Sequence, residues 1–198
     1  MTTSPSGRLL LIRHGETRWS LAGRHTGLSD LPLTAEGERR AAALAPLVAR
    51  FDVRWALCSP LLRARRTAAL VGLTPVVDPD LAEWDYGGYE GLTTAEIRKA
   101  TGTAWSLFDD GVVPGRTPGE TIGEVAARVS RVLARVAGRL EAGDVALVGH
   151  GHCLRVLAAT FLQQPPRLGA HLLLDAGSLS VLGDDRGVPA VRSWNRVP

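Results

Sequence analysis

The sequence predicts an α/β fold, a three-layer α/β/α sandwich around a mainly parallel central sheet, with a lid-like insertion. Short apolar runs at 8–13, 55–58 and 144–149 are typical of buried parallel strands, and stretches with helical periodicity lie between them. Strands that alternate with helices form a sheet covered on both faces. The segment 78–119 breaks this alternation and is rich in Gly, Pro, Trp and acids. Because a long insertion in a compact domain is usually functional, we interpret it as a lid over the strand ends.

Apolar spacing and capping residues locate the other elements. Leucines and valines at helical spacing predict a helix over 34–50. Ser59 and Pro60 are expected to supply the N-cap and the first-turn proline of a helix that reaches residue 71. Further segments complete the fold, a helix over 151–162 and closing strands or hairpins near 171–175, 178–182 and 188–194.

The longest predicted helix begins at a capping box, Thr121-x-x-Glu124, and Thr93-x-x-Glu96 has the same pattern. One face of this helix is apolar and carries Ile122, Val125, Val129, Val132, Leu133, Val136 and Leu140. Another face carries Arg128, Arg131, Arg135 and Arg139. We interpret the arginine face as a solvated surface rather than a binding patch.

Length and composition fit one compact domain over 1–198, because the chain has 198 residues of which 45% are hydrophobic and 22% charged. Residues 1–7 are expected to form a short flexible tail, without the pattern of a signal peptide. No apolar run approaches the roughly 20 residues that cross a bilayer. Cys58 and Cys153 lie far apart and form no C-x-x-C pair, so we expect two reduced, buried thiols in a cytoplasmic protein.

The charge pattern excludes another class of partner. Lys plus Arg is 23 and Asp plus Glu is 20, which gives a net charge of +3. The basic residues are scattered among acids, without the dense block that is typical of nucleic-acid binding. We therefore expect neither a nucleic-acid nor a membrane partner. A homo-oligomer stays open.

Three short stretches stand out because each follows a predicted strand, at 13–17, 59–63 and 149–152. The carboxyl ends of strands in open α/β sheets are where ligands bind. Helices begin after the second and third stretches, so we expect their amides to point into the same space. Arginines, histidines and helix N-termini that converge in this way favour a dianion, and the sequence therefore predicts a phosphate site.

These residue types also indicate a reaction. A neutral imidazole can attack phosphorus and form a phosphohistidine that water later hydrolyses. Guanidinium groups and a protonated histidine would stabilise the charge on the equatorial oxygens. The leaving oxygen needs a proton, and Glu83 in the insertion is the best candidate donor, because a phosphate dianion beside it would favour the protonated carboxyl group. Glu16 and Asp85 are weaker alternatives.

The chain resembles the histidine phosphatase superfamily, the phosphoglycerate-mutase-like enzymes, over nearly all its length. The resemblance rests on Arg-His-Gly-Glu-Thr at 13–17, Gly-Arg-His-Thr-Gly at 23–27, Ser-Pro-Leu-x-Arg-Ala at 59–64 and His-Gly at 150–151. It implies that His14 is the phosphorylated nucleophile and Glu83 the proton donor. It also implies a phosphate pocket and nearby backbone formed by Arg13, Arg63, His150, Thr26, Gly27 and Gly151. Ser20 departs from the pattern, because the family often has there an asparagine that contacts phosphate.

Within the superfamily, the stretch at 83–91, Glu-Trp-Asp-Tyr-Gly-Gly-Tyr-Glu-Gly, is similar to the sedoheptulose-bisphosphatase-type branch. That resemblance implies hydrolysis of sugar phosphates or bisphosphates. The mutases tend to carry Arg-His after the proton-donating glutamate. This chain has Trp84 and Asp85 there, and the extra carboxylate would disfavour a second phosphate nearby.

Other side chains are candidate substrate contacts with competing structural roles. His25 and His152 are as compatible with a surface or supporting position as with a substrate contact. Trp84 and Tyr86 could line a sugar-binding mouth or pack in the core. Arg24, with Arg116 and Arg155, is a candidate for a second phosphate. The spacing of His150 and His152 is too short for metal ligation on a helix, and we expect neither a metal ion nor another cofactor.

The sequence thus predicts a metal-independent phosphomonoesterase that acts on a small phosphorylated molecule. Three alternatives stay open. The first is a cofactor-dependent phosphoglycerate mutase, an isomerase that uses the same phosphohistidine. The second is a non-catalytic phosphate-binding module. The third is a protein-phosphohistidine phosphatase, although such relatives tend to be smaller and to lack the insertion.

Overall fold

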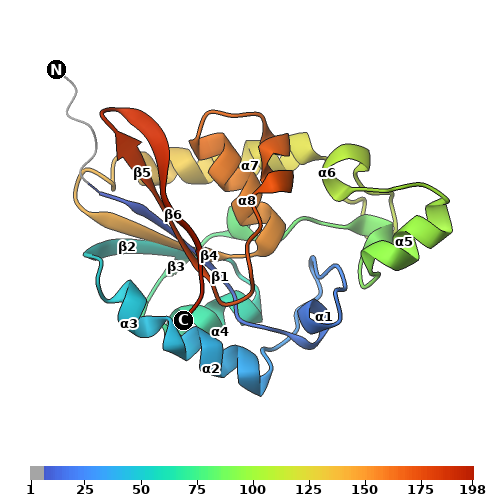
Figure 1. The fold of residues 1–198 in the computed structure, drawn as a ribbon, viewed down its shortest axis with the longest axis horizontal. Helices are drawn as coiled ribbons and strands as arrows, with labels where there is room; N and C mark the ends of the chain where they lie inside the picture. The colour runs from blue at the N-terminus through green and yellow to red at the C-terminus, as the bar shows by residue number, and fades with distance from the viewer. Residues whose placement is uncertain (1–6) are drawn as a thin grey trace.

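The computed structural model describes residues 7–198, in which six strands form one mixed sheet (Figure 1). The strands are β1 (Leu9–Arg13), β2 (Val53–Cys58), β3 (Val76–Val77), β4 (Asp144–Gly149), β5 (Leu179–Asp185) and β6 (Val188–Arg196). Their order is β3-β2-β4-β1-β5-β6. The pairs β2/β3, β2/β4 and β1/β4 are parallel, whereas β1/β5 and β5/β6 are antiparallel. The predicted α/β fold is confirmed, with an antiparallel hairpin at one edge.

Helices cover both faces of the sheet (Figure 1). One face packs against α2 (Ala35–Ala43), α3 (Ala45–Val48) and α4 (Leu62–Leu70), and the other against α7 (Ile122–Ala137) and α8 (Gly151–Phe161). Strand β1 shows why, because its side chains alternate between the two cores. Leu9 and Leu11 belong to the core under α7 and α8, whereas Leu10 and Ile12 belong to the other.

The remaining helical segments are short: α1 (Arg18–Leu21), η1 (Pro79–Leu81), η2 (Gly87–Tyr89), α5 (Thr94–Thr101), α6 (Leu107–Asp110) and η3 (Pro166–His171). Both predicted capping boxes are confirmed, at Thr93 for α5 and at Thr121 for α7.

Two helix predictions need correction. The single helix expected over 34–50 is divided at Leu44 into α2 and α3. Pro46 lies in the first turn of α3, where its missing amide costs least, so the chain restarts there rather than continuing α2. Helix α4 begins at Leu62, with Leu61 at the N-cap. Ser59 is therefore not the N-cap; its hydroxyl accepts from Leu61 N at 3.3 Å and lies 2.7 Å from His150 Nε2.

The closing strands near 178–182 and 188–194 are confirmed as β5 and β6, but no strand forms over 171–175 in the described chain, which has η3 and an irregular loop there. The edge strand β3 was not predicted, because two exposed valines give no periodicity. The tail expected over 1–7 falls outside the described residues except for Gly7. That residue is buried and its amide donates to the Leu140 carbonyl, so it belongs to the domain.

The prediction of a solvated arginine face is correct for Arg131, Arg135 and Arg139, which are exposed, and wrong for Arg128. Arg131 and Arg135 pair with Asp80, and Arg135 also pairs with Asp78, at the start of the insertion. Arg128 is only 7% exposed. The prediction that Arg128 faces solvent is wrong because residue 128 is three residues after Val125 and therefore lies on the buried face of the helix.

The insertion 78–119 packs as part of the domain. Its large side chains Trp84, Ile97, Trp105 and Phe108 are buried in the core under α7 and α8. An isolated bridge joins Arg24 to Thr93, which places the insertion beside the segment that follows β1. In Figure 1, α5 and α6 lie with α1 at the right of the view, beyond the sheet.

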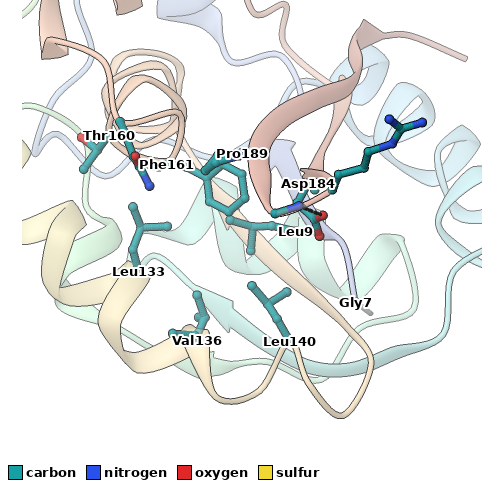
Figure 2. A pocket seen from close by; sticks show the side chains of 14 residues that line it. Gly7, Leu9, Leu133, Val136, Leu140, Thr160, Phe161, Asp184 and Pro189 are labelled. Carbon is teal, nitrogen blue, oxygen red and sulfur yellow. Dashed lines mark hydrogen bonds between the residues drawn. The ribbon is translucent and has the colours of Figure 1, made fainter. Parts of the chain in front are cut away.

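A cavity of about 640 Å³ lies at the N-terminal end of β1, between α7, the end of α8 and the β5–β6 hairpin (Figure 2). Its apolar wall includes Leu9, Leu133, Val136, Leu140 and Pro189. None of the predicted site residues lines it. No helix within residues 7–198 combines the length and the apolar composition needed to cross a membrane.

Candidate active site

The register of the parallel strands brings the three predicted stretches together. Arg13 in β1 lies opposite Gly149 in β4, and Cys58 in β2 lies opposite Val148. The next residues along each chain, His14, Ser59 and His150, therefore meet just beyond the same edge of the sheet. This edge is the one that the sequence predicts for ligand binding.

His14 is held in one tautomer. Its ring Nδ1 lies 2.6 Å from the carbonyl oxygen of Gly15. Because a carbonyl oxygen can only accept, Nδ1 carries the proton and Nε2 of the neutral ring has a free lone pair. Burial, together with the neighbouring charges of Arg63 and Arg13, holds the pKa of His14 well below its ordinary value of 6.5. The ring is thus a neutral imidazole with its nucleophilic nitrogen available.

The residue after His14 must be glycine. An added Cβ at Gly15 would lie 2.4 Å from the carbonyl oxygen of Gly37 in α2. The Gly15 amide donates to the hydroxyl of Thr67 at 3.0 Å, and the His14 amide donates to the Gly149 carbonyl at 3.0 Å. The backbone at His14 is therefore fixed from β4, α2 and α4 together.

His150 lies against His14, with ring centroids 5.1 Å apart. Its Nδ1 accepts from Arg63 Nε at 3.1 Å, and its Nε2 lies 2.7 Å from Ser59 Oγ. Burial, then the charge of Arg63, holds the pKa of His150 well below its ordinary value. The sequence predicts a protonated histidine beside the phosphate. His150 is not that group, because Arg63 occupies the nitrogen that would take the second proton.

Arg63 is fully buried behind this pair of histidines. Its guanidinium also donates to three backbone carbonyls on the loop after α1, those of Thr26, Gly27 and Ser29, at 2.8–3.0 Å. Its position near the start of α4 directs the side chain back toward the strand ends. Arg63 thus links this loop to His150, and its positive charge lies close enough to His14 to lower the pKa of that ring.

Arg13 presents a donor without a partner. Its Nη1 donates to the carbonyl of Leu174, and its buried Nε has no hydrogen-bond partner within residues 7–198. Gly151 lets the guanidinium come close, because a Cβ there would lie 3.3 Å from Arg13 Nε. A buried, unpaired donor on a cationic side chain fits an anionic ligand.

Glu83 is 5% exposed, and its carboxylate accepts three backbone amides. Trp84 N and Cys153 N donate to Oε1 at 2.9 and 2.8 Å, and His152 N donates to Oε2 at 3.1 Å. Two of these amides belong to the first turn of α8. The N-terminus of α8 thus binds the candidate proton donor through two amides, and Gly151 at the start of this helix lines the same cavity as Glu83.

A cavity of about 180 Å³ joins these groups. It is lined by Arg13, His14, Ser20, Gly23, Arg24, His25, Thr26, Glu83, Tyr86, Gly151, His152, Arg155 and Leu174. The cavity thus contains the candidate nucleophile, the candidate proton donor and three arginines. Most of the predicted substrate contacts lie in its wall.

Five predicted contact residues do not line the cavity: Trp84, Gly27, Arg63, His150 and Arg116. Trp84 is fully buried, its indole donates to the Glu120 carbonyl, and it packs in the core rather than at a sugar-binding mouth. Gly27 uses its amide for Glu90 and its carbonyl for Arg63. Arg63 and His150 lie behind His14, and their direct contact with a phosphate stays a prediction.

One wall of the cavity consists of uncharged rings. Tyr86 Oη lies 2.6 Å from His152 Nδ1, and the His25 ring packs 4.9 Å from the Tyr86 ring. Burial raises the pKa of Tyr86 well above the ordinary value of a tyrosine. Burial also holds the pKa of His152 well below the ordinary value of a histidine. Burial also lowers the pKa of His25 to about 4. Both histidines are therefore neutral near pH 7.

Three polar side chains of the cavity wall, Ser20, Arg24 and Arg155, are held by hydrogen bonds within the protein. Ser20 belongs to the capping box of α1, where its Oγ accepts from Thr17 N at 2.8 Å. Arg24 donates to the Gly91 carbonyl at 2.6 Å and pairs with Glu96 at 3.3 Å. Arg155 donates to the carbonyls of Gly169 and Ala170. Ser20 and the two arginines are thus already oriented by the protein.

The two alternative carboxylates lie outside the cavity. Glu16 accepts from Thr34 Oγ1 at 2.8 Å. Asp85 accepts from Gly87 N, from the Thr117 hydroxyl and from Gly119 N, and so closes the insertion on itself. Glu83 is thus the carboxylate that shares a cavity with His14.

Neither cysteine lines the cavity. Cys58 and Cys153 are free and buried, as predicted, and burial raises the pKa of Cys153 to about 11. Across the described part of the chain, no three His, Cys, Asp or Glu side chains come together in a way that could hold a metal ion.

Some site residues were missed. Leu174 supplies the carbonyl that holds Arg13, from a loop 161 residues away, and no sequence pattern indicates such a contact. Glu90 fixes the Gly27 and Ser29 amides. Glu90 lies within the 83–91 stretch that carries the family resemblance. That motif marks the residue but does not indicate which backbone amides its carboxylate binds.

Comparison with known proteins decides the family. The family model described as histidine phosphatase superfamily (branch 1) matches residues 9–197. The chain belongs to the histidine phosphatase superfamily. The predicted resemblance is therefore confirmed over almost the whole chain.

Similar proteins agree with this family. An acid phosphatase of Mycobacterium tuberculosis is 37% identical over 184 residues, which cover 91% of this chain and 88% of that protein. Sedoheptulose 1,7-bisphosphatase of Saccharomyces cerevisiae is 38% identical over 180 residues, 77% of this chain and 66% of that protein. The solved structure of an open reading frame from M. tuberculosis has a TM-score of 0.90 and 36% identity, covering 96% of this chain and 98% of that one. The chain is a phosphoric monoester hydrolase of this superfamily.

Proposed function

We propose that this histidine phosphatase hydrolyses small sugar phosphates or bisphosphates through a phosphohistidine on His14, without a metal ion. The observation that carries the proposal is the Nδ1 contact of His14 with the Gly15 carbonyl, which leaves Nε2 as a free nucleophile. His14, Arg13 and Glu83 line one cavity, so nucleophile, cation and proton donor can act on one phosphate.

In the first step, the lone pair of His14 Nε2 forms a bond to phosphorus while the bond from phosphorus to the ester oxygen breaks. The protonated carboxyl group of Glu83 gives its proton to the departing oxygen, so the product is a neutral alcohol. Arg13 donates to the equatorial oxygens, and buried Arg63 adds positive charge beneath them.

In the second step, the Glu83 carboxylate takes a proton from water, whose oxygen attacks phosphorus. The phosphorus–nitrogen bond breaks, and the electron pair returns to Nε2. The overall reaction converts a phosphate monoester and water into an alcohol and inorganic phosphate. His14 is then neutral again, and Glu83 has regained the proton that it gave up in the first step.

The cavity supports a small polyhydroxylated substrate. Its volume of about 180 Å³ suits a metabolite rather than a folded protein partner. Tyr86, His25 and His152 offer ring faces and neutral hydrogen-bonding groups to a sugar. Arg24 and Arg155 also line the cavity, and they are placed to receive a second anionic group. Similarity to a sedoheptulose 1,7-bisphosphatase supports this class of substrate.

The test is phosphate release from a panel of sugar mono- and bisphosphates in the presence of EDTA, ranked by kcat/KM. We expect turnover that EDTA does not reduce, and its loss in His14→Ala. His171→Ala is the matched control, because His171 is exposed and lies outside the cavity. Activity that survives in His14→Ala, or that EDTA abolishes, contradicts the proposal.

The mutase alternative uses the same nucleophile and is separated by its product. A mutase returns the phosphoryl group to the substrate, whereas a phosphatase passes it to water. We expect 3-phosphoglycerate with a trace of bisphosphoglycerate to yield free phosphate or no reaction. Rapid formation of 2-phosphoglycerate without free phosphate would assign the enzyme to the isomerases.

A further inference from the structure

We propose that Arg128 of α7, with Glu120, is a positioning residue for the proton donor Glu83. The inference rests on the proposed function, because it assumes that Glu83 protonates the leaving group. Arg128 does not line the active-site cavity, and its hydrogen bonds within residues 7–198 go to groups other than Glu83. Together, Arg128 and Glu120 hold the chain on both sides of Glu83.

Arg128 holds the chain just before Glu83. Its Nη1 donates to the carbonyls of Asp80 and Ala82 at 2.8 and 2.7 Å. The segment has no regular structure after η1, so no strand or helix fixes it there. Since a guanidinium presents several donors in a rigid plane, one side chain can bind both carbonyls.

Glu120 holds the chain just after Glu83. Its carboxylate accepts from Asp85 N at 3.0 Å, and its backbone carbonyl accepts from Trp84 Nε1 at 2.7 Å. The same carboxylate forms a two-fold contact with Arg128, at 2.8 and 3.0 Å. Arg128 and Glu120 therefore contact residues 80, 82, 84 and 85, and Glu83 lies at the centre of the clamped segment.

The pair also reaches the other element that orients the carboxylate. Arg128 Nη1 lies 3.4 Å from Cys153 Sγ, and Cys153 N donates to Glu83 Oε1 at 2.8 Å. Helix α8 supplies this amide, while α7 supplies Arg128. One buried guanidinium thus contacts both the segment that carries Glu83 and the helix end that binds its carboxylate.

The neighbouring arginines show that this arrangement is specific to residue 128. Arg131 and Arg135 also reach the insertion, but they pair with the side chains of Asp78 and Asp80. The Arg131 side chain is 58% exposed, whereas that of Arg128 is 9% exposed. Exposed ion pairs of this kind contribute little to geometry. Arg131 is therefore a matched control on the same helix.

The test compares two substrates whose leaving groups differ in their need for a proton. An alkyl phosphate such as glycerol phosphate releases a basic alkoxide, whereas 2,4-dinitrophenyl phosphate releases a stable phenolate. We measure kcat/KM, which reports formation of the phosphoenzyme. In Arg128→Lys we expect kcat/KM for the alkyl ester to fall about 10- to 100-fold, because misplacement of a catalytic group by about 1 Å can cost that much. For the dinitrophenyl ester we expect a change of less than about threefold, because the leaving phenolate needs no acid catalyst.

Two further variants separate the possible failures. In Glu83→Gln, kcat/KM should again fall mainly for the alkyl ester, and by more than in Arg128→Lys. In Arg131→Gln, kcat/KM should be unchanged for both esters. Equal losses on both esters in Arg128→Lys, with a selective loss in Glu83→Gln, would overturn the positioning role and leave the proposed function intact. A Glu83→Gln variant without selectivity would overturn the proton-donor assignment and the positioning role with it.

Poor folding of a variant does not obscure the result. The ratio of kcat/KM for the two esters is independent of the concentration of active enzyme, so a partly folded sample gives the same ratio. Glu120→Gln provides a second approach to the pair, because it keeps the size of the side chain and removes the charge that binds Arg128. We expect a selective loss on the alkyl ester there too, and an unchanged ratio would count against the proposal.

Discussion

Arg63 Nε donates to His150 Nδ1 at 3.1 Å, and this contact decides the charge of the active site. Because arginine can only donate, His150 Nδ1 must be unprotonated, and the ring is neutral with its proton on Nε2 toward Ser59. The positive charge near His14 therefore comes from the arginines, which cannot lose it near neutral pH. The nucleophile thus stays neutral beside permanent cations.

Replacement of Arg63 tests this relationship. Arg63→Lys keeps the charge but cannot reach His150 and the carbonyls of Thr26, Gly27 and Ser29 together. We expect the free energy of unfolding to fall by about 1.5–3 kcal/mol, as for loss of buried hydrogen bonds to a charged group, and kcat/KM to fall with it. Chemical denaturation and steady-state kinetics measure both. Arg65→Lys, an exposed position of the same helix, should change neither, and an unaltered Arg63→Lys would contradict the account.

The protonation state of His14 can be observed directly. Burial and the two arginines hold its pKa well below 6.5, and the Gly15 carbonyl selects the Nδ1–H tautomer. Long-range ¹H–¹⁵N NMR of ring-labelled protein should show a neutral Nδ1–H ring from about pH 7.5 down to about pH 5.5. A titration midpoint near 6.5, or a proton on Nε2, is the result that this account does not allow.

Acid should destabilise the protein at a higher pH than carboxylate protonation requires. The pKa values of His14, His25, His150 and His152 are all lowered in the folded state. At pH values well above 6.5, the ordinary histidine pKa, the four rings are neutral in both states and contribute nothing to the pH dependence. As pH falls below that value, the unfolded chain binds protons that the folded protein does not, so stability is lost.

The size of this loss is measurable by denaturant unfolding at several pH values. Each histidine that protonates only on unfolding contributes up to about 1.4 kcal/mol per pH unit. The pKa of His25 is about 4, so His25→Gln should reduce the slope by about one histidine's contribution between about pH 6 and pH 5. A stability that is constant over this interval would show that these rings are not buried neutral groups.

Two glycines on helices provide a matched stability test. A Cβ at Gly37 would lie 2.2 Å from the backbone oxygen of Glu16, whereas a Cβ at Gly138 meets nothing within 4 Å. We expect Gly37→Ala to destabilise the fold by about 1–3 kcal/mol through overpacking. Gly138→Ala should be neutral or stabilising by up to about 1 kcal/mol. Thermal unfolding compares the two, and equal effects would refute the close approach that also constrains Gly15.

The sequence predicted the fold and the centre of the site because both depend on local patterns. Apolar runs marked β1, β2 and β4, and the parallel register then brought His14, Ser59 and His150 to one edge. Glu83 could be named as the candidate proton donor although it lies in the insertion, because the leaving oxygen of the predicted reaction needs a proton. Its three amide donors could not be predicted, since they arise where the insertion meets α8.

The errors share a physical cause. The sequence gives no direct signal for contacts between distant segments, and these decide what a polar side chain does. The sequence left Trp84 open between a sugar-binding mouth and the core, and the contact of its indole with the Glu120 carbonyl places it in the core. Arg128 was assigned to solvent, although its spacing from Val125 already placed it on the buried face of α7. The helical periodicity thus predicts a buried position for residue 128, although an arginine is usually exposed to solvent.

The central claim is that His14 carries the phosphoryl group during turnover. Rapid quenching of the enzyme with a ³²P-labelled sugar phosphate, followed by peptide mapping, tests it most directly. The account predicts an acid-labile, base-stable label on the peptide that contains His14, formed within one turnover and absent from His14→Ala. Label on another residue, or complete turnover without any labelled protein, would contradict it.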